Sequence, residues 1–455
     1  MNQTNLYYST NQRAPGVSFK EALLKGLAPD GGLYMPLSFP KLDRGELENF
    51  SSDAYPEIAF RLISLLTGDE INRNDLMGIC RDAYDFDIPL QRVFERNYIM
   101  RLDQGPTASF KDFAARMMGR LMQYFLTLDN QHITILTATS GDTGSAVASA
   151  FYGLNNISVI ILFPSGEVTE MQRKQMTTLK KNIRVVAVDG KFDNCQMMVK
   201  KAFTDPLLSH IKLSSANSIN IGRLLPQCVY YFWAWSRLSA KANDPVVFSV
   251  PSGNFGNLMG GIIAREMGLP VKCFVIATNE NDEVPVYFKT GIYRICSPSK
   301  NCISSAMNVG HPSNMARVVA LYGGIMDEKG IILKEPDLGK MQKDFFAISV
   351  TEAETRDTIE KSYNRYKVLL EPHGAVAWCG LQKYLGKNSV STPDTQLNVS
   401  LETAHPAKFQ KEIEEILKFR PPLPSSLENL EDKTEEYISL ENNYELFRKY
   451  ILSNY

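Results

Sequence analysis

Short, mainly apolar runs alternate with helical segments through the middle of the chain. The segments SAVASAFYG, EMQRKQMTTLKK and NCQMMVKKAF repeat apolar residues at helical spacing. Before, between and after them lie runs typical of buried strands, at 133–138, 158–163, 183–188, 246–250 and 271–277. Strands that alternate with helices predict an α/β protein, with parallel sheets covered by helices on both faces. Such sheets bind ligands at the carboxyl ends of their strands.

Both ends of the chain depart from this alternation. The N-terminal part combines a turn-rich segment, GLAPDGGLYMP (26–36), with helix-like sequence around 55–83. Near the C-terminus a proline break is followed by acidic sequence, which we expect to be helical over 419–440. The predicted organisation is an N-terminal domain at 1–95 and a core at 96–455, with a smaller α/β subdomain at about 130–235 and a C-terminal helical appendage at about 420–455.

Composition and charge exclude several classes of function. Hydrophobic residues make up 44% and charged residues 22% of the 455, as in a globular protein with a sizeable core. A formal net charge of −1 gives no electrostatic reason to bind nucleic acid or an anionic membrane. No run approaches the ~18 apolar residues of a membrane span, and the polar N-terminus lacks a signal-peptide pattern. Seven cysteines without a C-x-x-C pair indicate reduced thiols, so we expect a soluble, cytoplasmic protein without a metal site.

Two glycine-rich turns each follow a predicted strand and precede a predicted helix. They are TATSGDTGSA (137–146) and VPSGNFGNLMGG (250–261). Amide groups at such a helix start bind a carboxylate or a phosphate, although plain, side-chain-capped turns have the same pattern. The chain has neither G-x-x-x-x-G-K-[ST] nor G-x-G-x-x-G. A phosphate bound by these loops therefore need not belong to a nucleotide.

Lys111 occupies an unusual position in DQGPTASFKDFAARM (103–117). Ser109 is placed to cap a helix whose apolar face begins at Phe113, so Lys111 lies in the first turn. A lysine there is either an ordinary surface residue or an amine whose pKa is lowered by the helix dipole and by burial. The second case is how proteins prepare a lysine to form a Schiff base.

Two of the five histidines also lie in predicted turns. His373 belongs to EPHGAVAW and His405 to LETAHPAKF, each beside a proline, where a structural role is commoner than general-base catalysis.

The reactive amine and the phosphate-binding loop are explained together by one cofactor. Pyridoxal 5′-phosphate needs a lysine for its aldehyde and a site for its phosphate.

The sequence resembles the threonine synthase family, within the tryptophan-synthase-β-like group of pyridoxal-phosphate enzymes. The resemblance runs through most of the chain in the family's order, from GVSFKEALLKGLAPDGGLYMP through GPTASFKDFAARM, TATSGDTGSA, NSINIGRLLPQ and VPSGNFGN to LETAHPAKF. It implies a two-lobed, parallel-sheet-based fold of type II with an N-terminal extension domain.

The resemblance also implies roles for particular residues. Lys111 would be the catalytic residue and form the Schiff base, and Thr403 would face the pyridine nitrogen. The cofactor phosphate would lie on the loop formed by Ser252, Gly253, Asn254, Phe255, Gly256 and Asn257. The substrate α-carboxylate would lie on the loop formed by Ser140, Gly141, Asp142 and Thr143.

The implied reaction converts O-phospho-L-homoserine and water into L-threonine and phosphate. A dianionic phosphate needs a further cationic site, for which we consider Arg223 with Asn217 or Asn220, and less readily Lys174. Arg223 could instead be a surface arginine at a helix start. A phospholyase or a serine/threonine dehydratase giving 2-oxobutyrate is the nearest alternative, and a non-catalytic anion-binding module a more distant one. The expected oligomeric state is a monomer or a homodimer.

Overall fold

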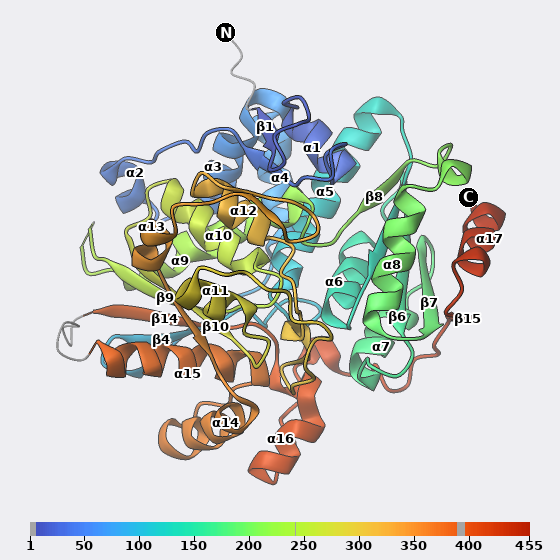
Figure 1. The fold of residues 1–455 in the computed structure, drawn as a ribbon. Helices are drawn as coiled ribbons and strands as arrows, with labels where there is room; N and C mark the ends of the chain where they lie inside the picture. Colours follow the sequence, from blue (N-terminus) through green and yellow to red (C-terminus); the bar gives the residue numbers. More distant parts are fainter. Residues whose placement is uncertain (1–5, 242, 389–395) are drawn as a thin grey trace.

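The larger of two main sheets has six strands and forms one lobe of the molecule (Figure 1). The computed structural model describes residues 6–241, 243–388 and 396–455. All neighbouring strands of this sheet are parallel except for the hairpin of β3 with β4. Its strands, in spatial order, are β13 (Phe345–Ser349), β10 (Val271–Thr278), β9 (Val246–Pro251), β14 (Leu397–Glu402), β4 (Asn97–Arg101) and β3 (Leu90–Phe94).

The second main sheet has five parallel strands and forms the smaller lobe. Its spatial order is β15 (Ile438–Glu441), β7 (Ile183–Asp189), β6 (Ile157–Pro164), β5 (Ile133–Ala138) and β8 (Leu213–Ser215). The strands expected at 133–138, 158–163, 183–188, 246–250 and 271–277 are all confirmed, to within one residue at either end. An α/β fold with two parallel-rich sheets is therefore confirmed.

Helices cover both faces of each sheet (Figure 1). In the larger lobe, one face packs against α15 (Pro372–Lys387), with α14 (Glu352–Tyr366) and α16 (Gln410–Leu417) outside it. The other face packs against α9 (Cys228–Leu238) and α10 (Gly256–Glu266). In the smaller lobe, α5 (Lys111–Asp129) and α6 (Asp142–Phe151) lie on one side. On the other side lie α8 (Phe192–Phe203) and α17 (Tyr444–Asn454), while α7 (Glu170–Thr177) packs on α6.

The remaining elements form the N-terminal extension and the connections. The extension contains a two-stranded sheet and four helices: β1 (Tyr7–Ser9), β2 (Tyr34–Pro36), α1 (Phe19–Lys25), α2 (Arg44–Asn49), α3 (Tyr55–Thr67) and α4 (Arg73–Ala83). The larger lobe also carries α11 (Glu283–Thr290), α12 (Met315–Leu321), α13 (Leu338–Asp344) and the hairpin of β11 (Ile325–Met326) with β12 (Ile332–Lys334). Short 3-10 turns lie at 68–70, 206–208, 221–223, 225–227, 305–307, 406–409 and 425–427.

The predicted helix over 419–440 is wrong. That stretch holds a short 3-10 turn and the strand β15, and only α17 after it is an α-helix. β15 extends the smaller sheet by pairing with β7, so the acidic tail is part of the fold and not an appendage. β3, which precedes residue 96, pairs within the larger sheet, and α9, which begins inside the range 130–235, packs on α10.

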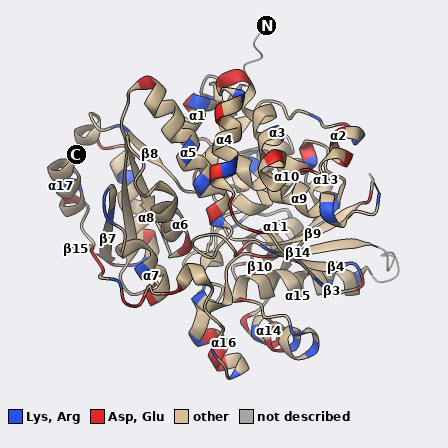
Figure 2. Ribbon diagram, turned by 180° about the vertical axis from the view of Figure 1, so that it is seen from behind, with Lys and Arg blue, Asp and Glu red and all other residues tan. Residues whose placement is uncertain are grey.

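Charged side chains of both signs are interspersed over the helices of both lobes (Figure 2). This distribution agrees with the formal net charge of −1. Within the three described ranges, no helix is both long and apolar enough to cross a membrane.

Candidate active site

A cavity of about 590 Å³ opens where the carboxyl ends of strands from both sheets come together. β9 and β14 of the larger sheet and β5 of the smaller one each lead directly into a loop that lines it. Of the fifteen predicted site residues, twelve line this cavity: Lys111, Ser140, Asp142, Thr143, Asn217, Arg223, Gly253, Asn254, Phe255, Gly256, Asn257 and Thr403. Gly141, Ser252 and Asn220 belong to the same loops but do not line it.

Lys111 is the first residue of α5 and so lies in its first turn, where the sequence pattern places it. Its side chain is only 14% exposed, and Nζ lies 3.5 Å from Asp142 Oδ2 and 4.9 Å from the centre of the Phe110 ring. Burial lowers the pKa of Lys111, and the positive charges of Lys408 and Arg223 lower it further, against the opposing effect of Asp142. The amine is therefore easier to deprotonate than an exposed lysine, chiefly because it is removed from water.

The turn before Lys111 is held differently from the prediction. Ser109 does not cap α5: its hydroxyl is buried and has no hydrogen-bond partner among the described residues. Instead, the Asp112 carboxylate accepts hydrogen bonds from Thr107 N at 2.8 Å and from Thr107 Oγ1 at 2.6 Å. A tertiary contact pairs Ser109 with Ala404, just after β14. The lysine and the loop that carries Thr403 are thereby joined.

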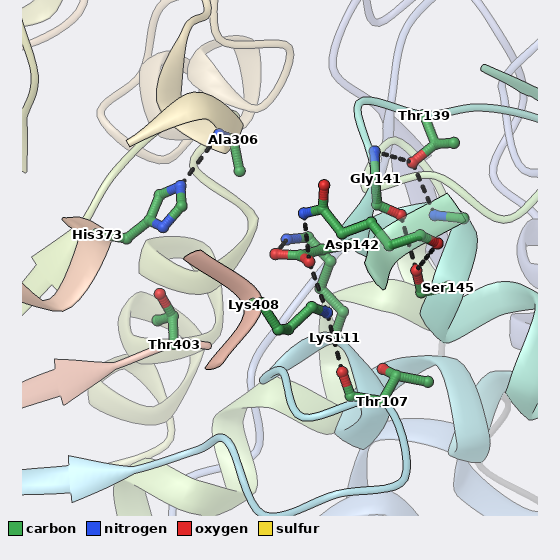
Figure 3. Close-up of polar contacts among 12 residues, drawn as sticks. Thr107, Lys111, Thr139, Gly141, Asp142, Ser145, Ala306, His373, Thr403 and Lys408 are labelled. Atoms are coloured by element: carbon green, nitrogen blue, oxygen red, sulfur yellow. Dashed lines mark hydrogen bonds and ion pairs between the residues drawn. The ribbon is translucent and has the colours of Figure 1, made fainter. Parts of the chain in front are cut away.

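Asp142 lies beside Lys111 and Lys408 (Figure 3), and it also contacts Gln172. Lys408 Nζ is 2.7 Å from Oδ1, and Gln172 Nε2 donates to the same oxygen at 2.9 Å. Burial alone would raise the pKa of Asp142, but Lys408 and Lys111 hold it well below its usual range. The negative charge of Asp142 is therefore already paired with the lysines of the protein.

The loop after β5 starts α6 without a cap from Ser140 or Thr143. Thr139 Oγ1 accepts from Gly141 N at 2.9 Å and from Gly144 N at 2.8 Å (Figure 3). Gly141 has φ +129°, and a Cβ there would lie 2.4 Å from the Gln172 side chain, so only glycine fits. Ser140 and Thr143 are left to line the cavity.

The loop after β9 approaches the cavity with its backbone. Phe255 has φ +62° and precedes α10, a left-handed conformation that non-glycine residues rarely adopt and that concentrates at functional sites. A Cβ on Gly253 would lie 2.8 Å from the carbonyl oxygen of Ala306. Asn257 Oδ1 accepts from two buried tyrosines, whereas its Nδ2 has no partner among the described residues. The free amide and the helix start beside the cavity suit an anionic group of a ligand.

Thr403 belongs to a chain of hydrogen bonds that crosses behind the cavity. Its hydroxyl donates to Glu371 Oε1 at 3.3 Å, and His373 Nδ1 donates to Glu371 Oε2 at 2.6 Å. His373 Nε2 accepts from Ala306 N at 3.0 Å (Figure 3). Both ring nitrogens are engaged, so His373 positions its neighbours and is not a free base. Burial and the nearby Glu371 raise the pKa of Glu402 well above its usual range.

His405 is also structural. Its Nδ1 accepts from Ala407 N at 3.1 Å, and burial lowers its pKa. It does not line the cavity.

Arg223 is a buried cation beside the cavity, not a surface residue. It is 4% exposed, and burial lowers its pKa to about 10, so it stays charged at neutral pH. Nη1 donates to Ala216 O at 2.7 Å, while Nε has no partner among the described residues. Among the described residues, no carboxylate lies within 4 Å of the Arg223 guanidinium. Such a cation can bind an anionic ligand.

The neighbouring asparagines have different surroundings. Asn217 lines the cavity and donates from Nδ2 to Ala138 O at 3.1 Å. Asn220 is fully buried, and its amide donates to Leu23 O at 2.9 Å and to Ser215 O at 3.0 Å. Asn220 therefore attaches the 217–223 loop to the N-terminal extension. Lys174 is outside the cavity and donates to Glu431 O at 2.8 Å.

Several residues of the site were not found from the sequence. Lys191, Phe192 and the 298–309 segment line the cavity, but no pattern in their sequence distinguishes them from ordinary loops. Arg317 is buried and donates to Tyr34 O and Ile219 O, which holds the extension against the 217–223 loop. Lys408 belongs to the motif LETAHPAKF, and its position in that motif is the only feature of the sequence that could indicate a role in the site.

These observations fit a cofactor with an aldehyde and a phosphate. An amine of lowered pKa faces a cavity of about 590 Å³. On that cavity the 252–257 loop presents a helix start and an unpartnered amide. The residues present therefore fit pyridoxal phosphate.

Comparison with known proteins extends over the whole chain. The family described as pyridoxal-phosphate dependent enzyme matches residues 88–397. The families described as threonine synthase N terminus and threonine synthase, C-terminal match residues 6–84 and 375–451. The chain is 39% identical over 457 residues to the threonine synthase of Haemophilus influenzae, with 100% of both chains covered.

Solved structures of similar proteins agree in fold. The pyridoxal-phosphate-bound threonine synthase from Brucella melitensis has a TM-score of 0.90 at 33% identity, over 98% of this chain and 99% of that one. The threonine synthase from Escherichia coli has a TM-score of 0.88 at 36% identity, over 99% of this chain and 100% of that one.

Proposed function

The chain belongs to the threonine synthase family of pyridoxal-phosphate-dependent enzymes, and on this premise we propose that it converts O-phospho-L-homoserine and water into L-threonine and phosphate. One observation carries the proposal. A lysine of lowered pKa lies in a cavity between two loops suited to anions, with a buried arginine beside them. The substrate has a carboxylate and a phosphate, and the cofactor adds a second phosphate.

The proposed cofactor is pyridoxal 5′-phosphate. The 252–257 loop would hold its phosphate, Lys111 would bind its aldehyde, and Thr403 would lie toward its pyridine nitrogen. When bound, the cofactor withdraws electrons from the carbon atoms of the substrate at which protons are removed. The Glu371 and His373 hydrogen bonds keep Thr403 and the 305–307 turn in place around it.

Lys111 has a second proposed role as the base of the reaction. With its amine free of the cofactor, Lys111 would accept a proton from Cα. After returning that proton to the bound substrate, it would accept one from Cβ. A neutral amine is needed for this, and burial favours the neutral form because it lowers the pKa of Lys111. Asp142 Oδ2, 3.5 Å away, limits where the released amine can lie.

Ser140 and Thr143 would bind the substrate α-carboxylate, and Arg223 the substrate phosphate. Asn217, beside Arg223 on the cavity, would complete the phosphate site. Arg223 has an unpartnered Nε and, among the described residues, no carboxylate within ion-pair distance, so its charge is available to a ligand. Phosphate leaves from Cγ, and water then adds at Cβ.

Product analysis tests the proposed reaction. The holoenzyme is given O-phospho-L-homoserine, and phosphate, threonine, ammonia and keto acid are quantified. The proposal expects one threonine for each phosphate released. Phosphate released with equal amounts of ammonia and 2-oxobutyrate would overturn it in favour of a lyase.

We also propose a cytoplasmic location. All seven cysteines are free thiols, and five of them are buried. Burial raises the pKa of Cys80 and Cys195 to about 12, so these thiols are inert. Such unpaired thiols persist in a reducing compartment.

A further inference from the structure

Two lysines, one fully and one largely buried, face one aspartate beside the cavity. Lys408 Nζ lies 2.7 Å from Asp142 Oδ1, and Lys111 Nζ lies 3.5 Å from Oδ2. The Lys408 side chain is fully buried, whereas 14% of the Lys111 side chain is exposed. Figure 3 shows both lysines reaching the same carboxylate from different elements. Lys408 therefore makes the shorter ion pair with Asp142 and is the more deeply buried of the two lysines.

Without Lys408, Asp142 would hinder the chemistry proposed above. A carboxylate within about 4 Å of an amine raises the pKa of that amine by roughly 1–3 units. Lys111 would then remain an ammonium ion, which neither binds an aldehyde nor accepts a proton. A bare Asp142 would also repel the substrate carboxylate from the adjoining residues Ser140 and Thr143.

We propose that Lys408 is a positioning residue whose ammonium group is the counterion of Asp142, so that Asp142 orients Lys111 without holding it as an ammonium ion. This inference rests on the proposed role of Lys111 in the reaction. Lys408 itself contacts neither substrate nor cofactor, since it does not line the cavity.

The fold holds Lys408 in this place through several hydrogen bonds. Its Nζ also donates to Thr107 O at 2.9 Å, in the turn that precedes Lys111. The segment that carries Lys408 is attached to the same turn by His405 N to Ala108 O at 3.0 Å and by Phe110 N to Thr403 O at 2.9 Å. The counterion and the reactive amine therefore share one rigid frame.

Gln172 completes the surroundings of the aspartate. Its Nε2 donates to Asp142 Oδ1, and its Oε1 accepts from Thr169 N at 3.2 Å, which fixes the amide orientation. Asp142 and Lys408 together carry no net charge. Lys111 therefore faces a neutral pair, and burial dominates its pKa.

The test measures how readily Lys111 loses its proton in variants of Lys408. The rate at which acetic anhydride modifies Lys111 in the apoenzyme is followed against pH by mass spectrometry. The pH titration of the visible absorption band is recorded for the holoenzyme. Lys408→Met is expected to raise the apparent pKa of Lys111 by about 1–2 units, which slows its modification at pH 8 about tenfold or more.

Three further variants decide between a charge effect and a packing effect. Asp142→Asn combined with Lys408→Met removes both charges and is expected to return the pKa of Lys111 to within about half a unit of the wild-type value. Lys408→Gln removes the charge but keeps an amide donor for Thr107, and it replaces Lys408→Met if that variant does not fold. Lys383→Met is the matched control. It removes a lysine of α15 that pairs with Glu354 at 2.8 Å, and it should leave the pKa of Lys111 unchanged.

An unchanged pKa of Lys111 in both Lys408→Met and Lys408→Gln would overturn the inference. A raised pKa that persists in the double variant would overturn it as well, because a neutral site should behave like the wild type. Modification of the apoenzyme needs neither substrate nor turnover. A failure here can thus be told apart from a failure of the proposed reaction, which product analysis detects.

Discussion

Arg223 offers a test in which activity should fall while stability is kept or increased. The side chain is 4% exposed, its Nη1 donates to Ala216 O at 2.7 Å, and its Nε has no partner among the described residues. A buried donor without a partner destabilises a protein by about 1–3 kcal/mol. An arginine in this state is explained best if a ligand supplies the missing acceptor.

Arg223→Met removes the charge and keeps most of the buried volume. One hydrogen bond to a charged group contributes about 1.5–3 kcal/mol, so kcat/KM for O-phospho-L-homoserine should fall about 10- to 150-fold. The free energy of unfolding of the apoenzyme should stay the same or rise by about 1 kcal/mol, because an unsatisfied buried charge is lost. Loss of the positive charge should also raise the pKa of Lys111, since Arg223 lowers it in the native protein.

The assays are steady-state phosphate release, inhibition by inorganic phosphate and urea unfolding. Arg265→Met is the matched control: Arg265 pairs with Asp344 at 3.0 Å and lies outside the cavity, so its loss should lower stability and leave KM unchanged. The reasoning is refuted if Arg223→Met keeps its KM and its sensitivity to phosphate, or if it loses stability as the control does.

Two further variants test the cofactor loop and a buried carboxyl group. Gly253→Ala places a Cβ 2.8 Å from Ala306 O, and a forced shift costing about 1–3 kcal/mol should raise the Kd for pyridoxal phosphate about 5- to 150-fold, measured by titrating the apoenzyme. Gly386→Ala, with no atom within 4 Å of the new Cβ, should bind like the wild type, and equal affinities in both variants would contradict the steric argument. Burial raises the pKa of Glu283 from about 4.5 to about 7, so the folded chain keeps a proton there that the unfolded chain has lost. Stability should therefore fall as pH rises from about 4.5 to 7, and Glu283→Gln should be about 1–3 kcal/mol more stable than the wild type in urea unfolding at pH 8. Equal stability at pH 8 would show that Glu283 has an ordinary pKa.

Local patterns in the sequence predict the strands and the loops of the site well. The run ITILTA coincides with β5, and Lys111 lies in the first turn of α5, as predicted. In both cases the information lies within a few residues, because a buried strand must be apolar and a strand-to-helix turn needs small or polar residues. The same locality explains why the loops at 137–146 and 250–261 could be identified as candidate anion sites.

Contacts between distant segments could not be predicted in this way. Asp112 bonds to Thr107 in place of the expected cap by Ser109, because the strand-like pairing of Ser109 with Ala404 takes that residue out of the capping position. Lys408 meets Asp142 only because the segment after β14 pairs with the turn before α5. No periodicity in the sequence predicts a contact of this kind.

The tail shows a further limit of pattern analysis. Its acidic residues suit an exposed helix, but a short strand on the edge of a parallel sheet can have the same composition. β15 is only partly buried, so it lacks the apolar run that revealed the other strands of that sheet. Its place beside β7 follows from tertiary packing.

The most direct test of the central claim is borohydride reduction of the holoenzyme followed by peptide mapping. The account predicts that the visible absorption band disappears and that the reduced cofactor is found on Lys111 alone. Lys111→Ala should show neither the band nor a reducible adduct. A cofactor adduct on another lysine, such as the buried Lys408, or an unchanged absorption band in Lys111→Ala, would contradict it.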